Sequence, residues 1–457
     1  MKISVVILAA GQGKRMRSRL PKVLQPLAGR PLLQHVVDTA RELEPSRICV
    51  VYGHGGETVQ AAFEGQPLDW ALQAEQLGTG HAVQQALPFL DDSHLALVLC
   101  GDTPLLRAST LTALLDAGGA DRLALLTADM DDPTGYGRII RDQRGHVAQI
   151  VEERDATNEQ RAVCEVNTGV LAAPVALLKK WLANLKADNS QGEYYLTDAI
   201  AMAVADGHPV AAVRAPVASE TLGINDRGQL ATAEAVCRHR ATEQLLEQGV
   251  TLADPTRIDV RGELKCGRDV FIDVNAVFEG EVTLGDDVRV APNTVIRDAS
   301  IGAGTNIHPN CVIEEAQIGE RCEIGPYARV RPGAELAEGV KLGNFVEIKK
   351  SVVGPGSKVN HLTYIGDASI GANVNVGAGT ITCNYDGANK HQTVIGDGAF
   401  IGSGVELVAP VAIGAGATIG AGSTISKSAP DGKLTLERAK QVTLDGWQRP
   451  VKKPKTT

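Results

Sequence analysis

The chain has 457 residues, of which 44% are hydrophobic, 4% aromatic and 22% charged, and its formal net charge is −9. This length predicts more than one domain, and the negative charge gives no reason to expect nucleic acid or an anionic membrane as a partner. The eight cysteines include no Cys-x-x-Cys pair. Free thiols in a reducing cytoplasm are therefore favoured over disulfides or a zinc site.

The first residues, MKISVVILAAG, superficially resemble a signal peptide, with one Lys, an apolar run and small residues. The run is short and GQGKRMRSR follows it at once, so we interpret it as a buried strand. No stretch of the sequence is long and apolar enough to predict a membrane-spanning helix.

Residues 1–226 alternate short apolar runs with helical patterns, which predicts a Rossmann-like α/β domain with a mostly parallel sheet and helices on both faces. The predicted strands are SVVILAA, RICVVYG, ALVLCGD, LALLTAD, AQIVEE, TGVLAA and VAAVRAP. The predicted helices include 32–43, 80–88, 108–117, 174–186 and 195–206.

The turn after the first strand reads LAAGQGKRMRSRLPK. Gly11 and Gly13 let a phosphate approach the backbone closely, and the amides that follow can cradle it. Met16 occupies the place of the third glycine of the dinucleotide fingerprint, and no GKS or GKT of a P-loop follows. Arg15 and Lys22 remain as cations that can neutralise a triphosphate.

This GxGxRM pattern with a following PK resembles the sugar-nucleotide nucleotidyltransferases, or pyrophosphorylases. QAEQLGTGHA, CGDTPLL, GYGRI, IVEE, VNTG and GIND are similar to other motifs of that family, although Cys100 stands where YGD or a similar triplet is usual. The resemblance implies attack of a sugar 1-phosphate on the α-phosphorus of UTP, with Arg15 and Lys22 as catalytic cations. The implied contacts to UTP and the sugar nucleotide are Leu8, Ala9, Ala10, Gly11, Lys22, Gln73, Gly78, Thr79, Cys100, Gly101, Asp102, Gly137, Glu152, Asn167 and Asn225.

Asp102 comes at the end of a strand, on the side where open α/β sheets bind ligands. A lone strand-end Asp is more often a helix cap than a metal ligand. The resemblance implies the second role, with Asn225 as its partner in holding Mg²⁺, because Mg²⁺ takes few protein ligands beside substrate phosphates.

Residues 227–249 carry apolar side chains at helical spacing, and Gly249 is a plausible stop. We expect a linker helix here, and the alternative is a last helix that packs on the first domain. Residues 250–457, with the basic tail RPVKKPKTT, then form the second domain.

An apolar residue recurs every sixth position from Val260 to Ile425, with a smaller companion four residues after most of them. A period of six is neither helical nor simple strand alternation, and it predicts a hexapeptide solenoid with three hexads in each triangular coil. Cys266, Cys311 and Cys322 fall on inward positions and are predicted to be small core residues. The pattern resembles the left-handed parallel β-helix of hexapeptide-repeat acyltransferases, and the left hand is implied by that resemblance.

Counting by coils places Arg331 beside Lys349, since 18 residues make one full coil, and Glu347 beside Tyr364. Like charges stacked across strands are unfavourable unless something neutralises them, as a bound phosphate does. His361 points outward nearby, where an imidazole can take a proton from an attacking amine, although most lone surface histidines have no such role.

The repeat fails at residues 382–393, TCNYDGANKHQT, which predicts either a binding loop or a tolerated surface loop. NVNVGAGTITCNYDGANK, GPYARVRPGAEL, GNFVEIKK and HLTYIGDA resemble the bacterial bifunctional N-acetylglucosamine-1-phosphate uridyltransferase/glucosamine-1-phosphate N-acetyltransferase family, and with the N-terminal motifs the resemblance covers nearly the whole chain. It implies His361 as general base, and glucosamine-phosphate contacts at Arg331, Lys349, Tyr364 and Asn375, with Asn384 also at the sugar. The implied acetyl-CoA contacts are Ala378, Asn384, Tyr385, Ser403, Ala421 and Arg438.

The family resemblance implies a cytoplasmic homotrimer, paired through the β-helix, with acetyl-CoA bound near the subunit junction. The leading hypothesis is an enzyme that acetylates glucosamine 1-phosphate and then uridylates it to UDP-N-acetylglucosamine, a precursor of peptidoglycan and lipopolysaccharide. The alternatives are a single-activity nucleotidyltransferase with a structural or regulatory solenoid, and a regulatory subunit without catalysis.

Overall fold

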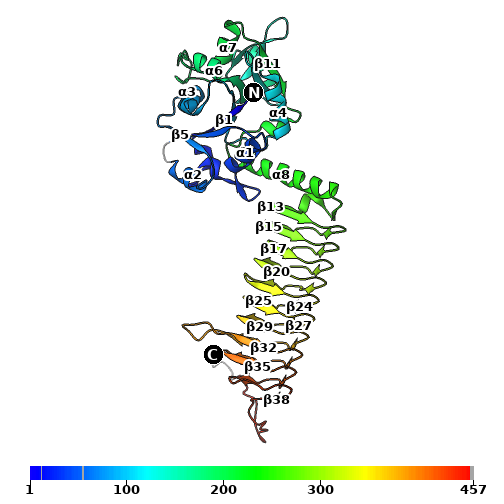
Figure 1. Cartoon of the computed structure of the whole chain (residues 1–457). Helices are drawn as coiled ribbons and strands as arrows, with labels where there is room; N and C mark the ends of the chain where they lie inside the picture. The colour runs from blue at the N-terminus through cyan, green and yellow to red at the C-terminus, as the bar shows by residue number, and fades with distance from the viewer. Residues whose placement is uncertain (12, 54–55, 453–457) are drawn as a thin grey trace, which may run out of the picture. The chain divides into compact units, whose positions relative to one another are not determined.

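The structure is a computed structural model that describes residues 1–11, 13–53 and 56–452, so the last five residues of the predicted tail lie outside the described residues. The chain divides into two compact units, Met1–Arg240 and Ala241–Thr457 (Figure 1). Among the described residues, no helix combines the length and the apolar character that crossing a membrane requires.

The first unit is built on a mixed sheet in the order β11-β7-β10-β6-β1-β4-β5. Parallel pairs join β1 to β4 and β6, β4 to β5, and β7 to β11, whereas β10 runs antiparallel between β6 and β7. The mostly parallel α/β sheet is therefore confirmed, with one reversed strand inside it. The strands are β1 (Ile3–Ala9), β4 (Arg47–Gly53), β5 (Asp69–Gln73), β6 (Leu95–Cys100), β7 (Leu123–Asp129), β8 (Arg138–Arg141), β9 (Val147–Val151), β10 (Glu165–Pro174) and β11 (Val210–Arg214).

Helices cover both faces of this sheet, because successive residues of a buried strand point to opposite sides. Val5 and Ile7 of β1 pack with α1 and α4, whereas Val6 packs with α3, α6 and α7. Two apolar cores result, one on each face. The helices are α1 (Leu32–Arg41), α2 (Glu57–Ala62), α3 (Thr79–Ala86), α4 (Ala108–Ala117), α5 (Asn158–Arg161), α6 (Val175–Leu182) and α7 (Asp198–Ala205).

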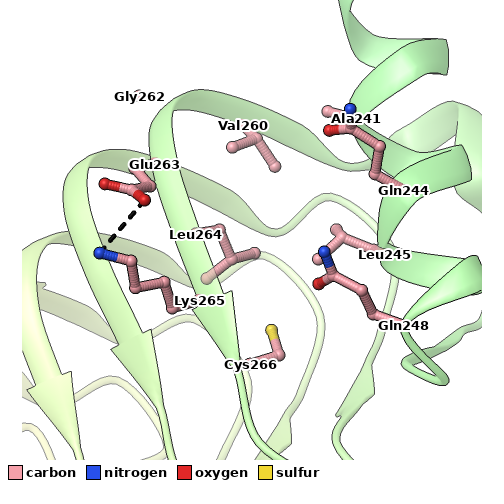
Figure 2. A pocket seen from close by; sticks show the side chains of 10 residues that line it. All are labelled: Ala241, Gln244, Leu245, Gln248, Val260, Gly262, Glu263, Leu264, Lys265 and Cys266. Carbon is pink, nitrogen blue, oxygen red and sulfur yellow. Dashed lines mark ion pairs between the residues drawn. The ribbon is translucent and has the colours of Figure 1, made fainter.

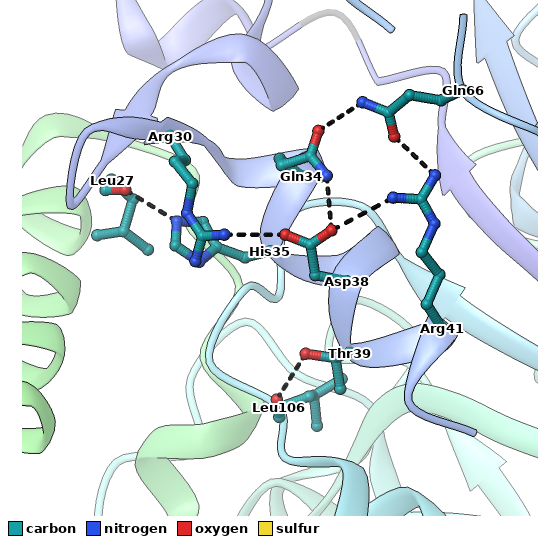
Figure 3. A network of polar contacts seen from close by, with 9 residues as sticks. All are labelled: Leu27, Arg30, Gln34, His35, Asp38, Thr39, Arg41, Gln66 and Leu106. Atoms are coloured by element: carbon teal, nitrogen blue, oxygen red, sulfur yellow. Dashed lines mark hydrogen bonds and ion pairs between the residues drawn. The ribbon is translucent and has the colours of Figure 1, made fainter. Parts of the chain in front are cut away.

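Helix α1 carries a ring of polar side chains on its outer side (Figure 3). Asp38 accepts hydrogen bonds from Gln34 and Arg41. Gln66 closes the ring, because it accepts a hydrogen bond from Arg41 and donates one to Gln34. On the same helix the Thr39 hydroxyl donates to the carbonyl of Leu106 at 3.3 Å. Helix α1 is thereby tied to the segment that follows β6.

Helix α8 (Arg227–Glu247) ends the alternating part of the chain. Within the first unit, Leu230 and Ala233 pack in an apolar cluster with Leu27 and Leu105. Within the second unit, Leu245 near the end of the helix belongs to the solenoid core. One helix thus supplies apolar side chains to the core of each unit.

The second unit is a β-helix of parallel strands, as the period of six predicts. One face is the sheet of β12 (Thr251–Leu252), β14 (Phe271–Ile272), β16 (Arg289–Val290), β18 (Asn306–Ile307), β21 (Glu323–Ile324), β24 (Lys341–Asn344), β27 (Lys358–His361), β30 (Asn375–Val376), β33 (Phe400–Ile401), β36 (Thr418–Ile419) and β38 (Leu434–Thr435).

The other two faces are joined in one sheet, because the long strands β13 (Asp259–Cys266), β15 (Val277–Leu284) and β17 (Val295–Ile301) each extend across both. Beyond them one face holds β19 (Val312–Glu314), β22 (Arg329–Val330), β25 (Glu347–Lys349), β28 (Tyr364–Gly366), β31 (Ile381–Cys383), β34 (Glu406–Val408) and β37 (Thr424–Ile425). The last face holds β20 (Ala316–Ile318), β23 (Ala334–Leu336), β26 (Val352–Val353), β29 (Ala368–Ile370), β32 (Thr393–Ile395) and β35 (Val411–Ile413).

The apolar hexad positions from Ile272 to Ile425 are all buried, whereas Val260 and Cys266 in the first coil are only partly buried. Partners in neighbouring coils are 17 or 18 positions apart. The coil that contains the predicted insertion is longer, since Ala372 bonds to Asp397 across 25 positions. The extra residues therefore project from one corner of this coil, while the coils on either side continue to stack.

Candidate functional site

The carboxyl ends of β1, β5 and β6 border a cavity of about 320 Å³ in the first unit. This is the edge at which parallel strands of an α/β sheet present their following loops to ligands. Ten residues that the sequence predicts as nucleotide contacts line it: Leu8, Ala9, Ala10, Gly11, Lys22, Gln73, Gly78, Thr79, Cys100 and Asp102.

The two glycines of the first turn differ in whether the surrounding chain leaves room for a side chain. Gly13 has φ of 61°, and a Cβ there would lie 2.6 Å from the Cβ of Lys22, so a side chain would displace that lysine. At Gly11, which lines the cavity, a Cβ would meet nothing within 4 Å. Packing within the chain therefore requires glycine at Gly13 but not at Gly11.

Lys22 and Asp102, which line this cavity, meet Asn225. The Lys22 ammonium donates to Asp102 Oδ2 at 2.5 Å and to Asn225 Oδ1 at 3.1 Å. The Lys22 and Asp102 side chains are 12% and 19% exposed. A carboxylate oxygen and an amide oxygen thus converge on one positive centre, and these hard oxygen donors suit Mg²⁺.

Among the described residues, no group of three or more His, Cys, Asp and Glu side chains is arranged to hold a metal ion. The pair of Asp102 and Asn225 fits a magnesium ion that takes its other ligands from substrate phosphates and water. Neighbouring Cys100 does not offer a thiolate, because burial, reinforced by the charge of Asp102, raises the pKa of its thiol to about 12.

A smaller cavity of about 90 Å³ adjoins the first, since Leu8, Thr79 and Cys100 line both. Glu152 and Asn167 supply polar groups to its otherwise apolar wall. Burial raises the pKa of Glu152, although the Thr197 hydroxyl, which donates to it at 3.1 Å, opposes this shift.

Gly137 belongs to the same cluster. Its carbonyl accepts from the Asn167 amide at 2.8 Å, and a Cβ there would lie 3.5 Å from the Glu152 carboxylate. The predicted residues Gly137, Glu152 and Asn167 therefore come together. Thr197 was missed from the sequence, where the polar Thr after the apolar stretch of EYYLTD was its only signal.

Four predicted residues of the first unit line neither cavity: Gly137 and Asn225, which contact residues that do, and Arg15 and Gly101. Arg15 is exposed, in a 3-10 turn at Lys14–Met16, and lines neither of the two. Gly101 is buried and donates its amide to the Leu8 carbonyl at 2.9 Å, which joins the ends of β1 and β6. The roles predicted for both remain predictions.

A separate cavity of about 380 Å³ lies in the second unit between the last turns of α8 and strand β13 (Figure 2). Gln244, Gln248, Leu264 and Cys266 are among its lining side chains. None of the site residues predicted from the sequence, all of which the structure describes, lines it.

The coil arithmetic for the second site is confirmed. Val330 pairs with Ile348 and Glu347 pairs with Tyr364, so Arg331 lies one coil from Lys349 on the same face. The Arg331 guanidinium donates to Glu347 Oε1 at 2.6 Å, and this hydrogen bond raises the pKa of Arg331. The chain itself thus supplies one carboxylate to this pair, and the predicted phosphate contact remains a prediction.

Lys390, from the insertion, is a third cation at this place. Its side-chain contact with Lys349, followed by its charge, lowers the pKa of the Lys349 ammonium. The sequence prediction did not include Lys390, although it lies in the stretch where the repeat fails. Arg331, Lys349 and Lys390 therefore form a cationic cluster that Glu347 compensates in part.

His361 pairs with Asn344 in the neighbouring coil, where His361 Nδ1 lies 2.9 Å from Asn344 Oδ1. With this amide oxygen as acceptor, the proton resides on Nδ1, and Nε2 retains the lone pair that a general base needs. Asn344 was missed from the sequence, although the same coil count that paired Arg331 with Lys349 would have found it.

The remaining predicted residues of this site come from both sides of the corner at Leu362. His361 and Asn375 belong to β27 and β30 on one face, whereas Tyr364 belongs to β28 on the next. A Cβ at Gly366 would lie 2.4 Å from the Tyr364 hydroxyl and 2.9 Å from Asn384 Nδ2, so these two polar groups converge there.

Asn384 is buried and donates to Asp367 Oδ2 at 2.5 Å. Tyr385 is 60% exposed, and its hydroxyl donates to the Gly387 carbonyl inside the insertion. The insertion thus folds back on itself at its base and presents an exposed ring.

The four residues predicted to line the coenzyme A channel follow one another from coil to coil. The carbonyl of Ala378 accepts from Gly404, which follows Ser403, and the carbonyl of Ser403 accepts from Gly422, which follows Ala421. Arg438 reaches the Ala421 carbonyl at 3.3 Å. The structure therefore arranges Ala378, Ser403, Ala421 and Arg438 as a continuous column.

Comparison with known proteins gives matches for both parts of the chain. Residues 5–233 match the family model described as the MobA-like NTP transferase domain, residues 260–363 the GMPPB C-terminal domain, and residues 392–427 the bacterial transferase hexapeptide (six repeats). The chain is 61% identical over 450 residues to the bifunctional protein GlmU of Azoarcus sp. (strain BH72), covering 98% of this chain and 100% of that protein. The chain belongs to the GlmU family of bifunctional proteins.

A second GlmU, from Aromatoleum aromaticum (strain DSM 19018 / LMG 30748 / EbN1), is 60% identical over 99% of both chains. The solved structure of a UDP-glucose pyrophosphorylase complexed with UDP-glucose is 16% identical, covers 52% of this chain and 100% of its own, and has a TM-score of 0.42. Membership of the GlmU family over the full length confirms the prediction of a bifunctional transferase with a nucleotidyltransferase part and a hexapeptide acyltransferase part.

Proposed function

We propose that each of the two sites catalyses one of the two reactions of a bifunctional enzyme of UDP-N-acetylglucosamine synthesis. The corner of the β-helix transfers acetyl from acetyl-CoA to glucosamine 1-phosphate, and the cavity of the α/β unit transfers uridyl from UTP to the product. The observation that carries the proposal is that one chain holds both the Lys22, Asp102 and Asn225 group and the His361 and Asn344 pair beside a cationic cluster. We divide the chain at residues 1–226 for uridyl transfer, 227–249 as linker and 250–457 for acetyl transfer.

In uridyl transfer the nucleophile is an already anionic phosphate oxygen, so a side-chain base is not needed. Asp102 and Asn225 would hold Mg²⁺, which when bound supplies positive charge against the triphosphate. Lys22 then has a second partner, because its ammonium can turn from Asp102 to a phosphate oxygen in the same cavity. Gly78, Thr79 and Gln73 border the part of the cavity that would receive the uracil edge.

In acetyl transfer the glucosamine nitrogen attacks the thioester carbonyl carbon of acetyl-CoA. A C–N bond forms, the C–S bond breaks, and coenzyme A leaves as a thiolate that takes up a proton. His361 Nε2 accepts the proton that the amine loses, while Asn344 holds Nδ1–H. Arg331, Lys349 and Lys390 would bind the sugar phosphate, and the column from Ala378 to Arg438 would contact coenzyme A.

We propose further that the enzyme is a homotrimer whose subunits contact one another through the β-helix. Tyr327, Phe345 and Leu362 stack at one corner, are 52%, 55% and 63% exposed, and all have positive φ. The rings of Tyr327 and Phe345 lie 5.3 Å apart. Bulky residues in this backbone region are uncommon, and an exposed apolar column beside His361 supports burial against a second copy of the chain.

The eight cysteines are all free thiols, which agrees with a cytoplasmic location. The products proposed here are precursors of peptidoglycan and lipopolysaccharide.

The test is to separate the half-reactions. His361→Ala should lower acetyl transfer about 10²- to 10⁴-fold while uridyl transfer persists, because only the base is lost. Asp102→Ala should abolish Mg²⁺-dependent uridyl transfer and leave acetyl transfer intact. Equal loss of both activities in either variant, or loss of neither, would reject the two-site assignment. A single-activity nucleotidyltransferase with a structural solenoid would show no acetyl transfer in the unaltered protein.

A further inference from the structure

A buried carboxylate, Glu220, lies in the segment of the chain that leads to Asn225. Glu220 is 1% exposed, and its Oε2 accepts a hydrogen bond from the Thr110 hydroxyl at 2.7 Å. Its Oε1 forms an ion pair with Arg107 Nε at 3.1 Å. A charge so deeply buried is costly unless it is paired and hydrogen-bonded, and both conditions are met here.

Glu220 connects the segment that precedes Asn225 to the start of the helix that follows the Asp102 loop. Arg107 and Thr110 begin helix α4, which directly follows the loop with Asp102. Glu220 lies in a 3-10 turn, Ala218–Thr221, which comes just before Asn225. The Ile224 amide donates to the Asp102 carbonyl at 2.9 Å and forms a second connection between the same two segments.

The loop that carries Asp102 is also held from its other side. The Leu106 carbonyl accepts from Thr39 of α1, as Figure 3 shows. The Leu105 carbonyl accepts from Arg240 of α8 at 2.7 Å. With these contacts the loop is fixed to helices. The segment around Asn225 is held against the loop by Glu220 and by the bond between Ile224 and Asp102. It is also held by the packing of Ile224 with Leu105, and by Lys22, which bonds both Asp102 and Asn225.

We propose that Glu220 is a positioning residue for uridyl transfer: it holds the segment with Asn225 against the loop with Asp102 and so sets the spacing of the two oxygens available to a divalent cation. This inference rests on the proposed function, because it requires these oxygens to be the metal ligands. Glu220 touches neither substrate nor metal in this scheme, and it acts only through the position of Asn225.

Glu220→Gln is the direct test, since the amide can still accept from Thr110 but no longer carries the charge opposite Arg107. The Mg²⁺ concentration for half-maximal uridyl transfer should rise roughly tenfold, the size expected for loss of a charge-assisted bond. Calorimetric affinity for UDP-N-acetylglucosamine should fall by a similar factor with Mg²⁺ present and stay unchanged in a chelator. Acetyl transfer should not change.

Glu165→Gln is a matched control from the same unit. Glu165 is 7% exposed, accepts from the Thr127 hydroxyl at 2.9 Å and pairs with Arg141 at 2.7 Å, so these partners lie on β7 and β8 and not in the Asp102 loop or the Asn225 segment. Its variant should leave the Mg²⁺ midpoint unchanged. If it shifts the midpoint as much as Glu220→Gln does, or if Glu220→Gln weakens metal-free binding equally, general loosening of the unit explains the effect and the proposal is wrong.

Arg107→Ala provides a second variant should Glu220→Gln fail to fold, because Arg107 is half exposed. It should move the Mg²⁺ midpoint in the same direction by a smaller factor, and an unchanged midpoint would overturn the proposal. Asp102→Ala distinguishes failure of the proposed metal site from failure of the proposed role of Glu220. If it leaves the Mg²⁺-dependent gain in binding intact, the proposed metal site itself fails; if it removes that gain while Glu220→Gln does not, only the role of Glu220 fails.

Discussion

Lys22 meets Asp102 and Asn225 across 80 and 203 positions of sequence, whereas His361 meets Asn344 across 17. The first group comes from loops at one edge of a sheet whose strand order departs from chain order. The second comes from neighbouring coils whose order is the chain order. Distance along the chain therefore indicates proximity in the solenoid and says little about proximity in the α/β unit.

The two sites also differ in how they hold charge. In the cavity, Asp102 is 19% exposed and meets one cation, so each group is compensated. On the corner of the solenoid three cations lie near the carboxylates of Glu347 and Asp367, and the contact with Lys390 lowers the pKa of the Lys349 ammonium. The cavity is arranged around opposite charges, whereas the corner keeps an excess of positive charge that an anionic ligand can complete.

The largest effect that would sharpen this comparison is expected at Asn344. Asn344→Ala should lower kcat for acetyl transfer about 10- to 100-fold, part of the contribution of a positioned base, because the proton of His361 loses its fixed place. Asn344→Asp should move the acid limb of the pH profile upward, since a neighbouring carboxylate stabilises the protonated imidazolium. An unchanged profile in both variants would show that the coil neighbour has no part in catalysis.

A substitution at Lys390 tests whether the excess positive charge on the corner of the solenoid binds the sugar phosphate. Lys390→Ala should raise KM for glucosamine 1-phosphate roughly tenfold, because one cation near the phosphate is lost. The Lys349 pKa, now lowered by Lys390, should rise, so the loss of binding on the alkaline side should begin at higher pH in the variant. Measuring KM across the alkaline range checks both, and a limb that moves to lower pH would contradict the contact between the two lysines.

Thr197 tests the sugar cavity of the first unit. Thr197→Val removes the hydroxyl that donates to buried Glu152 and should raise KM for N-acetylglucosamine 1-phosphate about five- to tenfold. Without this hydrogen bond the Glu152 pKa should rise further, because burial already raises it. Thr197→Ser keeps the hydroxyl and serves as the control. Equal KM values for the Val and Ser variants would show that the hydrogen bond is not needed.

The smallest effect is expected on the solenoid wall. Arg261, Glu279 and Arg297 form a ladder of exposed ion pairs along neighbouring coils. Arg261→Ala should change the free energy of unfolding by less than about 1 kcal/mol, because water screens such pairs. Denaturant unfolding followed by circular dichroism measures this, and a loss of several kcal/mol would mean that the wall charges stabilise the stack.

The sequence predicted the solenoid more fully than the α/β unit for physical reasons. A residue such as Ile348 must point inward wherever its coil lies, so the core and the pairing of Glu347 with Tyr364 followed from counting. Asp102 and Asn225 came together only through resemblance, because sheet order cannot be counted. Strands β5 and β8 were not predicted. The strand β10 was predicted, but its reversed direction and the buried partners of Glu220 gave no local signal, since each depends on contacts between distant segments.

The longer coil has a consequence for engineering. The bond between Ala372 and Asp397 spans 25 positions, yet the coils before and after it keep their register. A corner loop can therefore be exchanged for one of different length and chemistry as a self-contained cassette. Because the strands that flank the loop are unchanged, libraries varied only between Asn384 and His391 would explore new acyl acceptors on an intact scaffold.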